Sequence, residues 1–174
     1  MTKFFFIRHG EPDYTEANTR IYQNWGLNML TLSDKGIKQI KNTAEDPRLR
    51  NAQLIVTSPF GRALHTAAIL SRKLNTDIAV ETDLHEWMVD AEYRYLSDSE
   101  AAESFKEFCE HEGIRNDECR YNWETAERIV TRITSVLNKY RNYDEVIIVC
   151  HGVLMQYFLG IEYPDNGQIE EYVI

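Results

Sequence analysis

Short, almost unbroken runs of apolar residues recur along the chain. Phe4–Ile7, Leu54–Thr57 and Val146–Cys150 are such runs, and each is short enough for a strand. Near-continuous apolar strands are typical of parallel sheets, which are covered by helices on both faces. Ile78–Glu81 is a shorter strand candidate, and Ile169–Ile174 is a last one after a turn that contains Pro and Gly. The pattern therefore predicts five strands, most of them in one parallel sheet.

Segments with the apolar spacing of helices lie between these runs. Ser33 and Ser58 stand where N-caps are expected, and Pro59 follows the second of them at a favourable first helical position. Four segments are predicted as helices: residues 33–44, 58–74, 125–140 and 152–159. Strands that alternate with helices indicate an α/β protein, built as a three-layer α/β/α sandwich with a mostly parallel central sheet.

The region from Glu86 to Glu127 differs from the rest of the chain. It holds 13 acidic residues against four basic ones, together with seven aromatic side chains. One interpretation is a pair of solvated helices with an aromatic underside, and the other is a cap over an active site. No repeat, low-complexity tract or linker interrupts the sequence, so we expect residues 1–174 to form a single domain with 86–127 as a cap-like insert.

Composition and charge exclude several classes of function. The net charge of −9 argues against nucleic acid and against an anionic membrane surface as partners. No apolar run reaches the length of about 20 residues that spans a bilayer, and the first apolar run leads directly into Arg8-His9, unlike a signal peptide. We therefore expect a cytoplasmic protein. The three cysteines lack metal-site spacing and are odd in number, so neither a disulfide framework nor a zinc site is predicted, and no feature specifies an oligomeric state.

Two histidines share the same setting. His9 follows the first apolar run and precedes Gly10, and His151 follows the run at 146–150 and precedes Gly152. Ligands of open α/β sheets bind outside the carboxyl ends of the strands, so both imidazoles are expected at one edge. Each glycine would permit a tight turn and let a ligand approach the backbone.

Two arginines stand beside these positions. Arg8 adjoins His9, and Arg62 follows Ser58 at a junction between a strand and a helix. A guanidinium group and a helix N-terminus both favour an anion there, and arginine offers planar, bidentate donors that suit phosphate oxygens. The sequence thus predicts a local cationic phosphate site within an acidic chain.

The residues around His9 and His151 resemble the motifs of a known family. Arg8-His9-Gly10-Glu11 is similar to the signature of the histidine phosphatase superfamily, also called the phosphoglycerate mutase-like family. Other segments resemble further elements of the family in the same order along the chain: residues 32–39, 58–67, 84–86, 124–132, 149–152 and 166–167. The resemblance covers nearly the whole chain and implies the phosphoglycerate mutase-like fold.

The resemblance also implies roles for residues. His9 would be the nucleophile that becomes phosphohistidine, and Arg8, Arg62 and His151 would hold the phosphoryl oxygens. Glu86 would protonate the leaving group and then activate water, with its acidic neighbours favouring the protonated form. His9 must be neutral to attack, and the arginines disfavour its protonated form, whereas His151 could stay cationic against a phosphate dianion. No metal or cofactor is expected, because the cationic cluster supplies the positioning and charge stabilisation.

Some assignments stay open. Asp90 competes with Glu86 for the role of proton donor, and Glu11 could orient the site. Gly10, Glu11 and Tyr14 are expected to contact the phosphate or the substrate, and Asn18 is a further loop residue of this kind.

The function predicted best is a phosphatase that hydrolyses a phosphomonoester of a small metabolite. A phosphoglycerate mutase-type isomerase, a protein phosphatase and a non-catalytic phosphate-binding module are the alternatives. An acidic cap is a poor holder of a doubly anionic sugar acid, which disfavours the mutase. The length of the insert favours a small molecule over a protein substrate. The acidic, aromatic insert also points to an uncharged or cationic, ring-bearing substrate.

Overall fold

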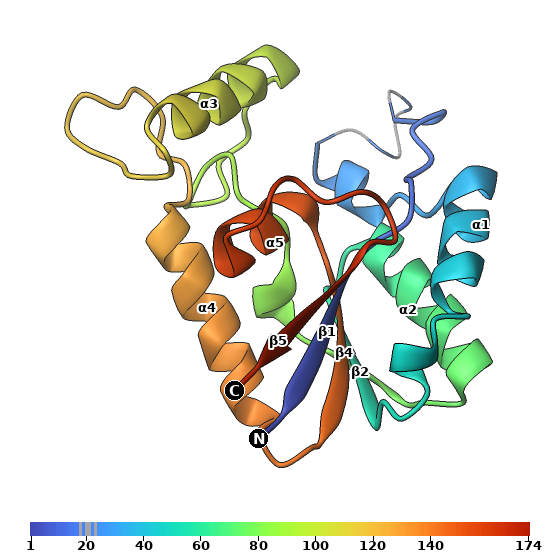
Figure 1. Cartoon of the computed structure of the whole chain (residues 1–174). Coiled ribbons are helices and arrows are strands. Elements are labelled where there is room, and N and C mark those ends of the chain that lie inside the picture. Colours follow the sequence, from blue (N-terminus) through green and yellow to red (C-terminus); the bar gives the residue numbers. More distant parts are fainter. Residues whose placement is uncertain (18, 20–21, 23) are drawn as a thin grey trace.

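A five-stranded sheet forms the centre of the molecule (Figure 1). The computed structural model describes residues 1–17, 19, 22 and 24–174. The strands are β1 (Lys3–Arg8), β2 (Leu54–Thr57), β3 (Ile78–Val80), β4 (Glu145–Cys150) and β5 (Ile169–Val173). Their order in the sheet is β3-β2-β4-β1-β5, and only the β1–β5 pairing is antiparallel. All five predicted strands and the mostly parallel sheet are therefore confirmed.

Helices cover both faces of the sheet. The helices α1 (Asp34–Thr43) and α2 (Gly61–Leu74) lie on one face, and α4 (Ala126–Lys139) and α5 (Gly152–Leu159) lie on the other (Figure 1). The short 3-10 helices are η1 (Asn24–Met29), η2 (Pro47–Leu49) and η3 (Thr82–Leu84). The remaining helix, α3 (Asp98–Glu110), lies apart from these layers, beyond the carboxyl ends of the parallel strands. This arrangement is the predicted three-layer α/β/α sandwich.

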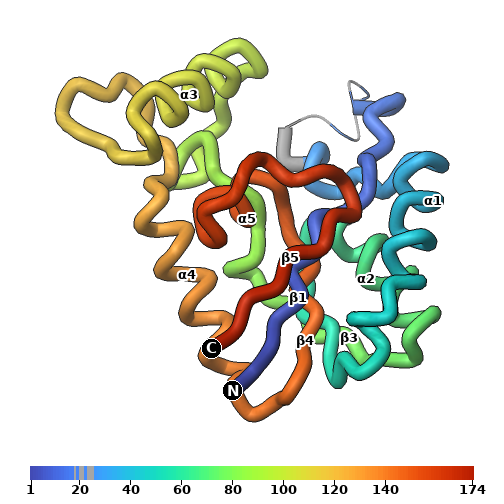
Figure 2. Tube along the Cα trace, in the orientation of Figure 1, coloured from blue at the N-terminus to red at the C-terminus, as the bar shows by residue number. Residues whose placement is uncertain are grey.

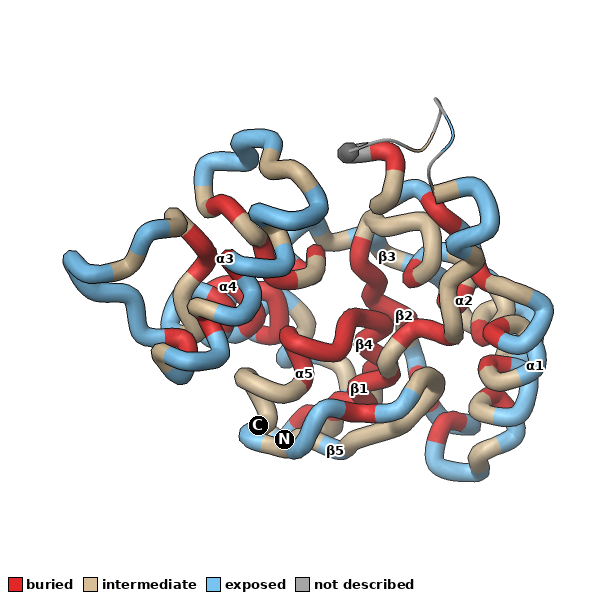
Figure 3. Tube along the Cα trace, turned by 90° about the horizontal axis from the view of Figure 1, so that it is seen from above, coloured by how far each residue is buried: buried red, intermediate tan, exposed pale blue. Residues whose placement is uncertain are grey.

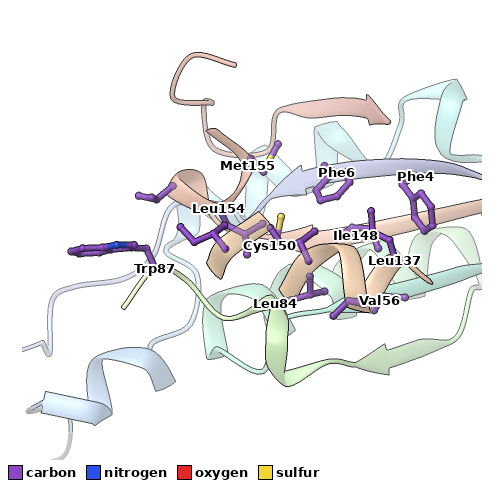
Figure 4. Packing of buried hydrophobic residues seen from close by; sticks show 14 of the residues in the cluster. Phe4, Phe6, Val56, Leu84, Trp87, Leu137, Ile148, Cys150, Leu154 and Met155 are labelled. Atoms are coloured by element: carbon purple, nitrogen blue, oxygen red, sulfur yellow. The ribbon is translucent and has the colours of Figure 1, made fainter. Parts of the chain in front are cut away.

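Alternate residues of the strands feed two separate cores. Phe4 and Phe6 of β1 pack under α4 and α5 with Ile148 of β4, whereas Phe5 and Ile7 pack under α1 and α2. Figure 4 shows the first of these cores, with Trp87 at its end, past Leu154. Buried residues follow β1, β2, β4 and α5 through the middle of the molecule, and exposed residues surround them (Figure 3). A strand that is buried on both faces explains the unbroken apolar runs.

The antiparallel strand β5 completes the sheet. It runs beside β1 and brings the two ends of the described chain together (Figure 2). None of the helices in this described part has the length and apolar character that crossing a membrane requires.

The two predicted helix starts have different outcomes. Ser33 is the N-cap of α1, and its hydroxyl accepts a hydrogen bond from the backbone N–H of Gly36, as expected. The prediction for Ser58 was wrong, because α2 begins only at Gly61, and its N-cap, Phe60, makes no side-chain capping bond. The Ser58 hydroxyl instead lies 2.7 Å from His151 Nε2.

The segment from residue 86 to residue 127, here called the cap segment, contains one helix and not the expected pair. The chain that follows α3 is bonded to a side chain of that helix. The carboxylate of Glu107 in α3 accepts hydrogen bonds from the backbone N–H groups of Arg120 (2.7 Å) and Tyr121 (3.0 Å) and from Trp123 Nε1 (2.9 Å). These donors are satisfied by a side chain, so the chain has no need of helical backbone bonds there. The expected aromatic underside is present, since Phe108 packs against the rings of Trp87 and Trp123.

The two ends of the cap segment are bonded to each other. Ala91 N donates to the Asn122 carbonyl (2.6 Å), and Glu124 N donates to the Met88 carbonyl (3.0 Å). The carboxylate of Glu124, which is fully buried, pairs with Arg132 of α4 through Nε (2.8 Å) and Nη2 (3.1 Å). This buried pair holds the base of the cap segment against α4.

Candidate active site

The two histidines meet at the carboxyl edge of the sheet, as predicted. His9 follows β1 and His151 follows β4, and these strands are neighbours in parallel register. The ring centroids lie 5.1 Å apart, and the rings are 4% and 0% exposed, respectively. Two strand-end histidines therefore form one buried imidazole pair.

Hydrogen bonds select the tautomer of His9. Nδ1 lies 2.7 Å from the carbonyl of Gly10, which can only accept, so Nδ1 carries the proton. Nε2 is then the basic nitrogen, and Arg62 Nε donates to it at 3.1 Å. Burial first, and Arg62 and Arg8 in addition, lower the pKa of His9 to about 3. The imidazole of His9 is therefore neutral, as the sequence suggested, although burial contributes more to the lowered pKa than the arginines do.

His151 is buried more completely than His9. Nε2 bonds Ser58, while Nδ1 is buried and has no hydrogen-bond partner within the described residues. Burial, and then Arg62 and His9, hold the pKa of His151 well below its ordinary value, so this imidazole is neutral here. The cationic His151 expected from sequence would require a bound dianion to offset that burial.

The two arginines approach the histidines from different elements. Arg8 Nη1 donates to the Pro164 carbonyl at 2.6 Å, and its guanidinium lies 4.6 Å from the ring centre of Tyr163. Arg62, in the first turn of α2, lies 5.1 Å from the ring of Phe60, and burial lowers its pKa. Both guanidinium groups are thus fixed by neighbours, and both line the same pocket as His9.

The two glycines make room for neighbouring parts of the protein. A Cβ on Gly10 would lie 2.7 Å from the carbonyl oxygen of Gly36 in α1, and one on Gly152 would lie 2.5 Å from the Tyr163 ring. The N–H of Gly10 is bonded to Thr66 Oγ1 at 3.1 Å. Gly10 therefore positions His9 through its carbonyl and lets α1 pack closely.

Residues after the first motif line the entrance. Glu11 accepts hydrogen bonds from Ser33 Oγ (3.0 Å) and Lys35 Nζ (2.5 Å), and these bonds lower its pKa. It thereby ties the strand end to the start of α1, in agreement with an orienting role. Tyr14 is 61% exposed at the mouth of the pocket. Asn18 lies outside the described residues.

Glu86 is the first residue of the cap segment, and its side chain meets the first turn of α5. Its carboxylate accepts hydrogen bonds from the backbone N–H groups of Trp87 (2.9 Å), Leu154 (3.3 Å) and Val153 (3.4 Å). Two of these donors belong to the first turn of α5, where a helix favours negative charge. These three hydrogen-bond partners are N–H groups and not the acidic neighbours that the sequence suggested.

The competing carboxylate, Asp90, is engaged elsewhere. It is 4% exposed and pairs with Arg94 through Nε (3.1 Å) and Nη2 (2.9 Å). Although burial opposes it, hydrogen bonding to Arg94 and to backbone N–H groups holds the pKa of Asp90 below its ordinary value. Glu86 shares a pocket with His9 and Arg62, whereas Asp90 does not line it, so geometry favours Glu86 as the donor.

The pocket, here called the phosphate pocket, gathers most of the predicted residues. Its lining consists of Arg8, His9, Glu11, Pro12, Asp13, Tyr14, Thr15, Ser33, Arg62, Glu86, Tyr163 and Asn166. His151 lies buried against His9 beneath it. Three of its functional contacts escaped the sequence analysis: Ser58 at His151, Tyr163 at Arg8, and Asn166, whose Nδ2 donates to the carbonyl of His9 at 2.9 Å.

Comparison with protein families agrees with this site. Residues 4–164 match the histidine phosphatase superfamily (branch 1), so the chain belongs to this superfamily. A curated relative, described as the uncharacterized phosphatase PhoE of Bacillus subtilis (strain 168), is 28% identical over 163 residues, which cover 91% of this chain and 76% of the relative.

Solved structures show the same fold. A mycobacterial glucosyl-3-phosphoglycerate phosphatase matches with a TM-score of 0.69 at 18% identity, over 98% of this chain and 90% of that chain. The alpha-ribazole phosphatase from Shigella flexneri matches with a TM-score of 0.68 at 22% identity, over 98% and 89%, respectively. The family and its phosphatase relatives support a phosphatase.

Proposed function

We propose that the protein is a phosphomonoesterase that works through a phosphohistidine on His9 and needs no metal. The observation that supports this most is the tautomer of His9: the Gly10 carbonyl holds the Nδ1 proton, so the lone pair of Nε2 faces the phosphate pocket beside Arg62. A neutral imidazole whose pKa is about 3 remains a nucleophile throughout the physiological pH range.

In the first displacement, His9 Nε2 attacks phosphorus and the bond from phosphorus to the ester oxygen breaks. The leaving oxygen takes a proton from Glu86, so the first product is a neutral alcohol. This step requires that Glu86 carries the transferable proton when the ester binds. Arg62 exchanges its bond to Nε2 for phosphoryl oxygens, and Arg8 and His151 stabilise the same charge.

In the second displacement, water attacks the phosphoryl group on His9. Glu86 accepts a proton from this water, the P–N bond breaks, and neutral His9 is regenerated with release of phosphate. The sum is ester plus water giving alcohol plus phosphate. A small phosphorylated metabolite fits this chemistry, since the cap segment overhangs the carboxyl edge of the sheet and limits access by a bulky protein substrate.

The test is release of phosphate from p-nitrophenyl phosphate with EDTA present, for the native protein and for His9→Ala. We expect turnover by the native protein and none by the variant, and rapid quenching in alkali, which preserves the acid-labile P–N bond, should trap the phosphoryl group on His9. Loss of activity in EDTA would overturn the metal-free mechanism, and near-native turnover by the variant would overturn the nucleophile. A folded native protein without any turnover would overturn the phosphatase itself.

A further inference from the structure

A second cavity, here called the cap cavity, opens beside the phosphate pocket. Its volume is about 250 Å³, and it lies between α2, the chain after Glu86 and the start of α3. Its apolar walls come from Phe60, Trp87, Tyr93, Tyr95, Leu96 and Ala101. No step of the proposed hydrolysis uses these side chains.

Two residues belong to both spaces. Arg62 and Glu86 line the cap cavity as well as the phosphate pocket. In the proposed reaction, Arg62 binds the phosphoryl oxygens and Glu86 protonates the ester oxygen. A phosphomonoester seated on His9 therefore directs the group carried by that oxygen past Glu86 and into the cap cavity.

The walls suit a ring system. A cavity of roughly 150 Å³ lined by apolar side chains accommodates benzene, and the cap cavity is larger at about 250 Å³. Tyr95 is 62% exposed, so a ligand could cover apolar surface that water now contacts. The backbone of Tyr93 has a φ of 59°, a conformation that a tyrosine rarely adopts, and its ring packs edge-on to His85 at 6.0 Å. Strain of this kind is concentrated at ligand sites.

The charges of the cap cavity exclude a second anionic group. Of the cations in its described lining, Arg62 faces His9, and Arg94 is paired with Asp90 at 2.9 Å. The other charged residues there, Glu86 and Asp98, are acidic. A carboxylate or a second phosphate on the leaving group would meet acids without a free counter-ion among these residues.

We infer that the cap cavity is the leaving-group subsite, and that it selects phosphomonoesters whose alcohol carries an uncharged aromatic ring over small or anionic ones. This inference rests on the proposed function and deepens it, because it names the class of substrate. It also separates the protein from a mutase, whose sugar-acid substrate carries extra negative charge.

The experiment compares kcat/KM for three alkyl phosphates, each of which releases a primary aliphatic alcohol: 2-naphthylmethyl phosphate, ethyl phosphate and carboxymethyl phosphate. We expect the naphthylmethyl ester to exceed ethyl phosphate at least tenfold, and the carboxymethyl ester to fall below ethyl phosphate. Equal values for the naphthylmethyl and ethyl esters would overturn the inference but leave the phosphatase intact. Turnover of none of the three, and none of p-nitrophenyl phosphate, would instead overturn the proposed function.

Two neighbouring alanines of α3 give a matched pair of variants. Ala101 lines the cap cavity, whereas Ala102 is exposed. Ala101→Phe should fill the space and reduce the naphthylmethyl preference at least tenfold while kcat/KM for ethyl phosphate stays within twofold, and Ala102→Phe should change neither. If Ala101→Phe is unfolded by circular dichroism, Tyr95→Ala, at an exposed side chain, serves in its place and should reduce the same preference. An unchanged preference in the folded cavity variant would overturn the inference.

Discussion

His151 Nε2 lies 2.7 Å from Ser58 Oγ, although the two residues are 93 positions apart in the sequence. The serine follows β2 and the histidine follows β4, which are hydrogen-bonded neighbours in the sheet. The bond fixes one ring nitrogen of His151 and leaves the other, Nδ1, buried without a partner among the described residues. Ser58 is thus a positioning residue for an imidazole that would contact the phosphoryl group.

Removing the Ser58 hydroxyl should therefore slow the reaction without unfolding the protein. A hydrogen bond of this kind contributes about 1 kcal/mol, so Ser58→Ala is expected to lower kcat/KM roughly fivefold. The melting temperature, measured by circular dichroism, should change little, and Ser99→Ala on exposed α3 is a suitable control. Native kcat/KM in Ser58→Ala would show that His151 needs no such support.

The two candidate proton donors can be separated by isosteric changes. Glu86→Gln keeps one acceptor oxygen for the backbone N–H groups of α5 but removes the transferable proton. The kcat should therefore fall at least 100-fold, while the inhibition constant for inorganic phosphate stays within a few-fold. Asp90→Asn removes the partner of Arg94 and should alter stability more than kcat. Steady-state kinetics and phosphate inhibition check both. The reverse pattern, with kcat lost only in Asp90→Asn, would transfer the role to Asp90.

The buried histidines predict an acid-sensitive fold. The folded-state pKa values of His9, His85 and His151 lie below that of an unfolded histidine, which is about 6.5. As the pH falls below 6.5, the unfolded chain binds protons that the folded one does not, so the free energy of unfolding decreases. For His9 this loss continues until its folded pKa of about 3.

Urea unfolding between pH 6.5 and 5 isolates this effect from the carboxylates, which titrate lower. Each such histidine contributes a slope of up to about 1.4 kcal/mol per pH unit. His9→Gln should make the decline shallower, because it removes one of the buried imidazoles. Identical slopes in native protein and His9→Gln would contradict the neutral, buried imidazole.

The ion pair between Glu124 and Arg132 should be costly to break from one side. Glu124→Gln leaves the Arg132 guanidinium buried without its counter-ion, which lowers the free energy of unfolding by about 3–5 kcal/mol. The double variant Glu124→Gln, Arg132→Met should recover part of that loss. Urea denaturation measures both, and a single variant as stable as the native protein would show that the pair is dispensable.

Much of the fold could be predicted because the apolar runs are buried on both faces. Phe4–Ile7 and Val146–Cys150 gave correct strands, since no partial exposure obscures their pattern. The meeting of His9 and His151 followed from strand-end positions alone. The expectation of a second helix in the cap segment failed because the side chain of Glu107 in α3 accepts the hydrogen bonds of the backbone N–H groups there.

The rest of the site depends on contacts that local sequence does not encode. Tyr163 reaches Arg8 across 155 positions, and Ser58 reaches His151 across the sheet. Ser58 followed by Pro59 predicted a helix start because sequence preferences for helix N-caps consider only residues that are neighbours along the chain. Such pairs become visible once the order of the strands places their ends side by side.

The hydrogen bonds that join Ala91 to Asn122 and Met88 to Glu124 have an evolutionary consequence. Between these paired ends, the chain leaves the catalytic layer and returns to the same place. Closure entropy grows slowly with loop length, by about 0.6 kcal/mol for each doubling. The part of the cap segment between these bonds is therefore replaceable. It can be lengthened, shortened or exchanged for that of another member of the superfamily while the sheet and the two imidazoles keep their geometry. Substrate preference in the superfamily can then diverge through changes in this segment, while the residues of the phosphate pocket stay the same.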